Sequence, residues 1–216
     1  MTTLNWSQFL LLMSGLQWTL ILTVTGFVGG AIGGLLIALS RSSENAALSR
    51  FAWAFIEVFR GTPLLMQLFV VYYGIALLDM AISPWAAVAV ALTLNASAFL
   101  GEIWRGSIQA LPRGQIEAAK ALGLHYWPRM GSVILPQALR LSIPSTIGFL
   151  VQLLKGTSLA AIVGFTELAR SGTIVSNLTY KPLLVYGIVG LIYFLLCWPL
   201  SIMGRRLETR LARADR

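Results

Sequence analysis

The chain has few of the residues on which most enzyme active sites depend. Its 216 residues include one cysteine, one histidine and eight acidic residues. Cys197 therefore has no partner for an intrachain disulfide, and neither Cys197 nor His125 belongs to a cluster with metal-ligand spacing. The chain also lacks a G-x-x-x-x-G-K-[ST] sequence, the loop that holds nucleotide phosphates. We therefore predict no catalytic residue, no metal site and no cofactor on this chain.

Charged residues of either sign are scarce as well. They make up 11% of the chain, whereas hydrophobic residues make up 57%, and a soluble domain carries about 25% charged residues. Five apolar stretches are long enough to cross a bilayer as helices. We place them near 14–40, 52–77, 84–104, 142–166 and 184–204. The predicted fold class is an all-α membrane protein with about five transmembrane helices, forming a single transmembrane domain over residues 1–216.

The net charge of +8 indicates the orientation of the chain in the membrane. Lys and Arg gather in the first and third connections and after residue 204, whereas the second connection has none and the fourth has only Arg170 and Lys181. Basic loops face the cytoplasm, so we predict a cytoplasmic C-terminus and an N-terminus outside. We expect no nucleic-acid binding and, because no basic residue precedes the first apolar run, no cleaved signal peptide.

The third connection, about 106–140, contains a short predicted helix. It has about two or three turns near 115–124, between Pro112 and Pro128, and Gly123 is a typical stop signal for it. Its small apolar face, formed by Ala118, Ala119 and Leu122, suits docking into a groove on another protein, with Glu117 at the rim. A helix that lies on the membrane surface is the alternative, and composition alone favours that alternative.

Ionisable and polar residues inside the apolar spans mark possible functional positions. Glu57 and Arg60, and likewise Glu102 and Arg105, are three residues apart near the cytoplasmic ends of two spans, a spacing that permits intrahelical ion pairs. Pro63 is expected to kink the second span. The substrate pathway that we predict combines the polar residues of several spans: Gln67, Asn95, Glu102, Lys155, Thr157, Ser158 and Glu167.

The fourth span carries the strongest of these signals. Lys155-Gly156-Thr157-Ser158 interrupts its middle, which suggests a broken helix that lines a polar cavity. Its exposed amides would bind a substrate carboxylate, with Lys155 nearby. The alternative is that Lys155 pairs with Glu102 or Glu167 and only stabilises the bundle. Glu167 lies towards the outer end, where it would act at the opening of the pathway.

Glycines recur every four residues in the first span. Gly26, Gly30 and Gly34 share one face, as do Gly29 and Gly33. Small residues at this spacing allow a second helix to approach closely. The pattern fits packing within one subunit and packing between two subunits equally well.

Several segments resemble motifs of the permease subunits of ATP-binding-cassette importers, in the branch that takes up polar amino acids. The third connection is similar to their coupling loop through Glu117-Ala118-Ala119, Gly123 and Ile134-Leu135-Pro136. Two further segments resemble motifs of this family. The family's second-span motif is matched by Phe59-Arg60-Gly61-Thr62-Pro63-Leu64-Leu65, and its fourth-span motif by Leu154-Lys155-Gly156-Thr157-Ser158-Leu159 with Glu167-Leu168. The resemblance extends from about residue 14 to 210, with one departure at Gly156, where the family usually has an acidic residue.

The resemblance implies a transport subunit of a multi-pass bacterial inner (plasma) membrane complex. The implied partners are a second permease copy or a related permease, two ATPase subunits that bind ATP and Mg, and an extracytoplasmic amino-acid-binding protein. Alternating access would move a polar amino acid, with Glu117, Ala118, Ala119, Leu122 and Gly123 coupling the chain to the ATPases. The alternatives are a permease of the methionine-type or another branch, an ion-driven secondary transporter, and a membrane scaffold without transport activity.

Overall fold

The computed structural model describes residues 5–43 and 45–214, with side chains up to residue 211. Every regular element in these ranges is helical. The elements are α1 (Trp6–Arg41), α2 (Ala46–Gly61), α3 (Leu64–Ala76), α4 (Pro84–Gln109), α5 (Arg113–Ala121), α6 (Tyr126–Pro128), a π-helical segment (Arg129–Ile134), α7 (Leu135–Gly156), a 3-10 helix (Thr157–Val163), α8 (Leu168–Thr179) and α9 (Pro182–Ala214).

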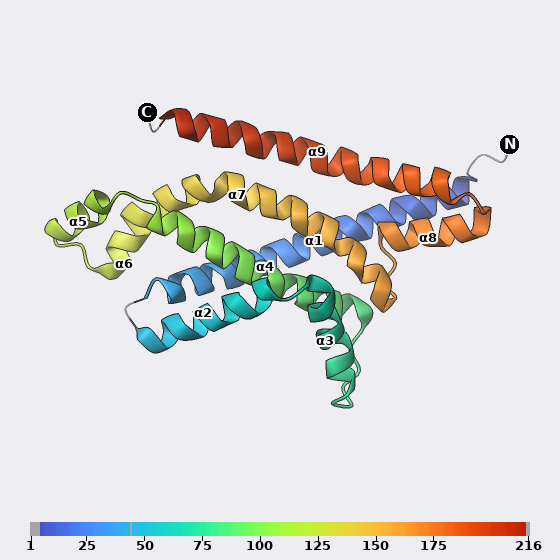
Figure 1. The fold of residues 1–216 in the computed structure, drawn as a ribbon, viewed down its shortest axis with the longest axis horizontal. Helices are drawn as coiled ribbons and strands as arrows, with labels where there is room; N and C mark the ends of the chain where they lie inside the picture. The colour runs from blue at the N-terminus through green and yellow to red at the C-terminus, as the bar shows by residue number, and fades with distance from the viewer. Residues whose placement is uncertain (1–4, 44, 215–216) are drawn as a thin grey trace.

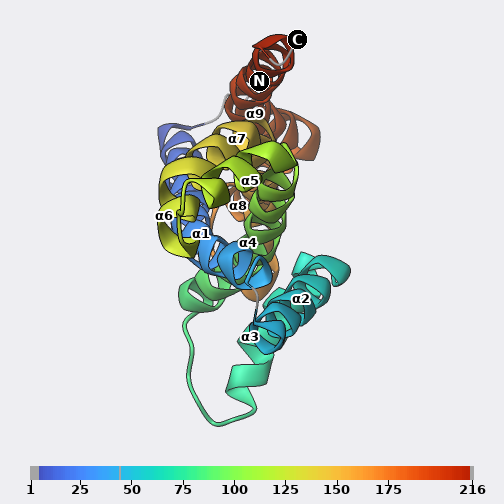
Figure 2. The same ribbon diagram turned by 90° about the vertical axis from the view of Figure 1, so that its left-hand side faces the viewer.

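The long helices α1, α4, α7 and α9 run along the same direction and form an elongated bundle (Figure 1). α5 and α6 lie at one end of it, and α8 lies at the other. α2 and α3 project from one side of the bundle, as the end-on view in Figure 2 shows. Four helices of the described residues are long and apolar enough to cross a membrane, and the bent pair α2 and α3 makes a fifth if it counts as one span. The all-α membrane fold and the number of spans agree with the prediction.

The second span departs from the kinked helix predicted over 52–77. It begins earlier, at Ala46, and bends by 104° between α2 and α3. Thr62 is extended, with φ −114° and ψ 144°, because the residue before a proline is disfavoured in the helical conformation. Pro63 precedes the first turn of α3 and has no N–H to donate to the preceding helix. The kink expected at Pro63 is therefore a complete break.

The fourth span also differs from the prediction. It begins before residue 142, in the π-helical segment, and no gap follows Lys155; instead the α-helix passes into a 3-10 helix at Thr157. The next connection contains α8, a helix that the sequence analysis does not predict. α8 has only 12 residues and buries a narrow stripe that includes Leu168 and Val175, so its apolar signal is weak.

The glycines of α1 pack against α4 of the same chain. A Cβ atom added to Gly26 would lie 2.9 Å from Cβ of Leu92, and one added to Gly34 would lie 2.9 Å from Cβ of Leu100. Gly30 faces Ala96 even more closely. Of the two possibilities left open by the spacing, the structure supports packing within one subunit. This close contact makes α1 and α4 the centre of the main apolar core.

We expect Gly30→Leu to reduce the stability of the isolated chain, because the added side chain has no space between α1 and α4. Overpacking of this kind costs about 1–3 kcal/mol. Thermal unfolding of the purified chain in detergent measures the effect. Gly187→Leu is the matched control, since a Cβ at Gly187 would meet no atom of the described residues within 4 Å. An equal loss of stability in both variants would contradict the close-packing explanation.

Candidate functional site

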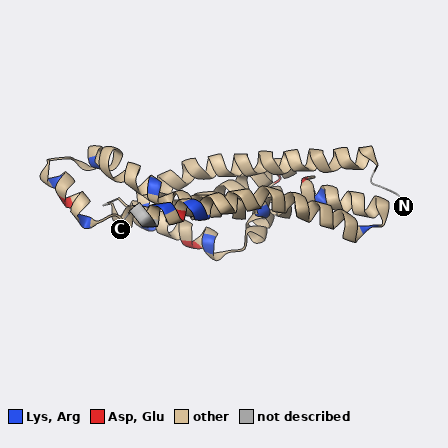
Figure 3. Cartoon of the chain, turned by 90° about the horizontal axis from the view of Figure 1, so that it is seen from above, with Lys and Arg blue, Asp and Glu red and all other residues tan. Residues whose placement is uncertain are grey.

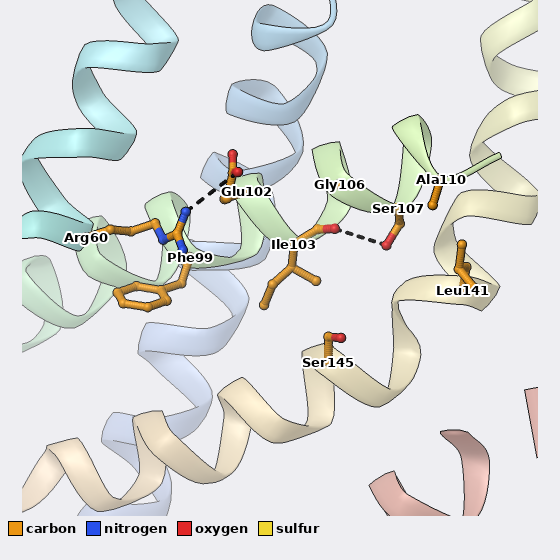
Figure 4. Close-up of a pocket in the computed structure, with 9 residues that line it drawn as sticks. All are labelled: Arg60, Phe99, Glu102, Ile103, Gly106, Ser107, Ala110, Leu141 and Ser145. Carbon is orange, nitrogen blue, oxygen red and sulfur yellow. Dashed lines mark hydrogen bonds and ion pairs between the residues drawn. The ribbon is translucent and has the colours of Figure 1, made fainter. Parts of the chain in front are cut away.

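An open cavity of about 420 Å³ lies between α4, α7 and the C-terminal end of α2. Its polar lining comes from Arg60, Glu102, Ser107 and Ser145, and Phe99 supplies an aromatic wall. Figure 4 shows Arg60 reaching over the Phe99 ring from α2, while Ser145 lies across the cavity on α7. Three helices that are distant in the sequence thus contribute to one polar space.

Helical periodicity explains why these side chains share the cavity. Phe99, Ile103, Gly106 and Ala110 lie on one face of α4 at spacings of three or four residues. A smaller cavity of about 200 Å³ adjoins the first at Phe99 and is lined in part by Asn95 and Gln152. The two cavities follow α4 and α7 along much of their length. Trp104 Nε1 of α4 donates to Thr146 Oγ1 of α7 (3.1 Å), which fixes these helices beside the cavity.

Three charged residues form a cluster at the larger cavity. Arg105 donates two hydrogen bonds to the carboxylate of Glu102, at 2.7 and 2.6 Å, so the predicted intrahelical pair is confirmed. Arg60 was predicted to pair with Glu57, and this prediction is wrong. Nη1 of Arg60 lies 3.7 Å from Oε1 of Glu102, because the helix break directs the end of α2 towards α4.

Gln67 and Asn95, both predicted for the substrate pathway, are in direct contact at the helix break. Nδ2 of Asn95 donates to Oε1 of Gln67 (3.0 Å). Nε2 of Gln67 in turn donates to the backbone carbonyls of Phe59 (2.6 Å) and Thr62 (3.0 Å). Both side chains are buried. They satisfy carbonyl groups that lost their helical partners at the break, so their first role is structural, although Asn95 also borders the smaller cavity.

The residues around the end of α7 do not converge with Asn95 on one site. Lys155 is exposed, and the ion pairs of the described residues include none between Lys155 and Glu102 or Glu167. The hydroxyls of Thr157 and Ser158 donate to backbone carbonyls three residues earlier, each at 2.7 Å. These hydroxyls are therefore engaged within their own helix.

Gly156, the position of the family's acidic residue, packs against α3. A Cβ atom at Gly156 would lie 2.9 Å from Cδ2 of Leu64. A larger side chain would require Leu64 to move. The absence of a side chain at this position thus accompanies a close approach of α3 to the end of α7.

Glu167 is fully buried and joins three helices. Its carboxylate accepts hydrogen bonds from the backbone N–H groups of Ala169 (2.8 Å) and Arg170 (2.9 Å), and from the hydroxyl of Tyr193 (3.0 Å). Thr19 of α1 adds a longer contact at 3.4 Å. Burial raises the pKa of the Glu167 carboxyl, while these hydrogen bonds lower it. This residue is an N-cap of α8 and lies outside the candidate membrane spans.

The predicted docking helix corresponds to α5. Ala119 is buried, whereas Glu117 and Ala118 are exposed, and 79% of Leu122 is accessible. Gly123, with φ 73°, follows the helix in the left-handed region that favours glycine. Trp127, not among the predicted contact residues, is 72% exposed close by in the sequence. Together α5 and Trp127 present a small exposed apolar surface.

Arg60, Phe99 and Ser145 belong to the cavity but not to the predicted pathway. Arg60 was interpreted as part of an intrahelical ion pair, and Phe99 and Ser145 were not singled out. The available signal was the sequence Arg60-Gly61-Thr62-Pro63, since a helix that ends here has a terminal arginine free to turn towards another helix.

Comparisons with known proteins give consistent results. Residues 26–213 match the family described as "Binding-protein-dependent transport system inner membrane component". The chain is 33% identical over 211 residues to the probable amino-acid ABC transporter permease protein YckA of Bacillus subtilis (strain 168), covering 98% of this chain and 93% of that protein. It is 35% identical over 208 residues to the glutamine transport system permease protein GlnP of Escherichia coli (strain K12), covering 95% of each.

Two solved structures are similar over nearly their whole length. One, described as an amino acid ABC transporter with histidines, has a TM-score of 0.86 at 35% identity and covers 97% of this chain and 100% of its own. The other is an inward-facing conformation of the MetNI methionine ABC transporter, with a TM-score of 0.76 at 25% identity and coverage of 95% and 99%.

We expect Gln67→Leu to destabilise the chain by about 1–3 kcal/mol, because it removes the donor of the short bonds to the partly buried carbonyls of Phe59 and Thr62. Asn95→Leu should cost less, since it removes the support of Gln67 and only a long contact, of 3.5 Å, to the carbonyl of Phe59. Thermal unfolding in detergent measures both effects. Gln152→Leu is the control, because Gln152 is an exposed glutamine beside the same cavity. If Gln67→Leu and Gln152→Leu unfold at the same temperature, the proposed support of the break is wrong.

Glu167 should make stability depend on pH in a defined direction. The carboxyl loses its proton near its ordinary pKa of 4.5 in the unfolded chain but keeps it to higher pH in the folded chain. The folded state thus binds more protons above pH 4.5, and the contribution of Glu167 to stability falls as pH rises through its folded pKa. Glu167→Gln should reduce the loss of thermal stability as the pH rises above the ordinary pKa of 4.5. Glu117→Gln, at an exposed position, should not; equal pH profiles for all three proteins would contradict this assignment.

Proposed function

We infer that this chain, which belongs to the family of binding-protein-dependent transport system inner membrane components, is the permease subunit of an ATP-driven amino-acid importer. The main evidence is the similarity to amino-acid permeases over nearly the whole chain, at 33–35% identity. The cavity along α4 and α7 supports this inference, because it is a polar space beside helices long enough to cross the membrane.

The proposed orientation has α5 and the C-terminus in the cytoplasm. In Figure 3 most Lys and Arg residues lie at the end of the bundle that carries α5 and the C-terminal end of α9. Arg170 and Lys181 belong to the opposite end, where α8 lies. Basic residues are retained on the cytoplasmic side during membrane insertion, so this distribution favours an external N-terminus.

The proposed partners follow from the division of labour in such importers. Two ATPase subunits would bind ATP and Mg, an extracytoplasmic binding protein would deliver the amino acid, and a second copy or a related permease would complete the pathway. The similar methionine transporter MetNI is likewise described as an ABC transporter, a class of protein that is powered by ATP. Helix α9 presents many exposed apolar residues, including Leu191, Phe194 and Trp198, which lipid or a second permease would cover.

A continuous apolar cluster connects the proposed docking helix with the cavity. Ile116 of α5 packs against a buried group that contains Ile108 of α4, Met130 and Ile134 of the π-helical segment, and Ala138 of α7. α4 and α7 are the same two helices that line the cavity. Movement of α5 on ATP binding would therefore displace the cavity walls, which is the requirement for alternating access.

An ion-driven secondary transporter is the second candidate. The observation in its favour is Glu167, a fully buried carboxyl with a raised pKa, since such groups carry protons in some transporters. However, the two N–H groups of α8 explain its burial as a helix cap. Amino-acid uptake by the permease alone in liposomes, driven only by an ion gradient, would support this candidate.

We expect Leu122→Asp to lower ATP-driven uptake of amino acids by about tenfold or more, because it introduces a charge into the exposed apolar face that would dock on the ATPase. Uptake of radiolabelled glutamine and arginine is measured in proteoliposomes that contain the permease, its co-purified ATPase and binding protein. Leu178→Asp is the matched control, since Leu178 is 65% exposed on α8 at the opposite end.

Two results would contradict the proposed role of α5. One is normal ATP-driven uptake with Leu122→Asp in the complex. The other is labelling of Gln115→Cys by an impermeant thiol reagent applied to intact cells, in a Cys197→Ser background, because that residue of α5 would then face outwards. The absence of ATP-driven uptake of every amino acid by the wild-type complex would instead contradict the proposed function itself.

A further inference from the structure

We propose that Arg60 binds the carboxylate of the transported substrate in the cavity between α2, α4 and α7, and that this cavity prefers neutral and acidic amino acids to basic ones. The proposal rests on the proposed function, since it concerns the substrate of the same pathway. It adds a recognition residue and a substrate charge class.

The first observation is that the hydrogen-bonding groups of Arg60 are available. Both oxygens of Glu102 accept short hydrogen bonds from Arg105, at 2.6 and 2.7 Å. Arg60 contacts the same carboxylate only at 3.7 Å, beyond hydrogen-bonding distance. Among the hydrogen bonds of residues 5–43 and 45–214, none has the Arg60 side chain as donor. Glu102 thus attracts Arg60 without occupying its donors.

The second observation is that Arg60 is held in position at the cavity. Its guanidinium carbon lies 5.5 Å from the centroid of the Phe99 ring, within the range of a cation–π contact. Figure 4 shows the guanidinium group between this ring and Glu102. Its side chain is nevertheless 42% exposed. An arginine that is oriented but still accessible can bind a carboxylate through two parallel hydrogen bonds.

The third observation concerns the charge of the cavity. Arg60 and Glu102 line the cavity with opposite charges, and the positive surplus comes from outside the lining, from Arg105 bonded to Glu102 and from Arg41 within its electrostatic range. A neutral amino acid adds no net charge to this region, and an acidic one reduces its positive charge. A basic amino acid adds a further positive charge, which the low dielectric of the membrane makes unfavourable.

Neutral oxygen atoms are available for the substrate's ammonium group. Ser107 donates its hydroxyl proton to the carbonyl of Ile103 (3.0 Å), so its oxygen keeps accepting capacity. Ser145 faces the same cavity from α7. A zwitterionic amino acid that enters the cavity loses water from both charged groups. Arg60 would replace the water at the carboxylate, and these hydroxyls would replace the water at the ammonium group.

The test is equilibrium binding to the detergent-purified permease–ATPase complex in the absence of the binding protein, so that the selectivity of the binding protein does not contribute. The probes are L-glutamine, L-glutamate, L-lysine and L-glutaminamide, in which the carboxylate is blocked. We expect the wild-type complex to bind glutamine or glutamate about tenfold or more tightly than lysine and glutaminamide, as one charge-assisted interaction implies.

Arg60→Gln should remove the preference for glutamine over glutaminamide, because the variant has lost the carboxylate partner. Arg50→Gln is the matched control: the same substitution on α2, at an exposed residue outside the cavity, should leave the preference unchanged. If Arg60→Gln does not assemble, Arg60→Lys decides, since lysine keeps the charge but not the paired donors. The proposal is supported if Arg60→Lys prefers glutamine over glutaminamide less strongly than the wild-type complex does.

The proposal is overturned if the wild-type complex binds lysine as tightly as glutamine, or if substitution of Arg60 leaves the discrimination against glutaminamide unchanged. In either case ATP-driven amino-acid uptake by the wild-type complex would still support the proposed function. Loss of ATP-driven uptake by the wild-type complex would instead contradict the proposed function. Failure of the Arg60 proposal and failure of the proposed function are therefore distinguishable.

Discussion

The requirement that backbone carbonyls inside a membrane find donors within the protein governs the arrangement of α2, α3 and α4. Pro63 ends α2 and leaves carbonyls of its last turn without helical partners. Gln67 supplies donors to two of them, and Asn95 orients Gln67. This compensation accompanies a bend of 104° between α2 and α3. The sharp turn in turn directs Arg60 to the cavity.

The second constraint is the close contact of α1 with α4. Glycines on α1 leave no room for side chains between the two backbones, so α4 has a rigid support on the face opposite the cavity. The cavity residues Phe99 and Glu102 are therefore held on a helix that cannot easily shift towards α1. On the other side, the bond from Trp104 to Thr146 links α4 to α7. The cavity therefore has one wall, α4, that is rigidly supported by α1, and a second wall, α7, that is linked to α4 by a hydrogen bond.

The all-α fold and its membrane character were predictable because the apolar runs are long and backbone groups in lipid must be helical. The Glu102–Arg105 pair was also predictable, since it depends only on spacing within one helix. Arg60 was assigned the wrong partner because the direction of a side chain after a helix break depends on tertiary structure, as the contact with Glu102 illustrates. The contact between Gln67 and Asn95 depends on two helices and has no pattern in the sequence. α8 was missed because a helix of 12 residues, capped by a buried glutamate, resembles a polar connection.

The π-helical segment between α6 and α7 is the least regular part of the path from the docking helix to the cavity. π-helical turns contain wider, less common hydrogen bonding and often occur at functional sites. Here Met130 and Ile134 of this segment pack against Ile116 of α5, and Leu141 and Ser145 of α7 follow on the cavity side. The six residues of π-helix at the base of α7 lie between this apolar cluster and Ser145 of the cavity. The two long cavity walls thus differ in their support, because α4 packs against the glycines of α1, whereas α7 is linked to α4 through Trp104 and Thr146.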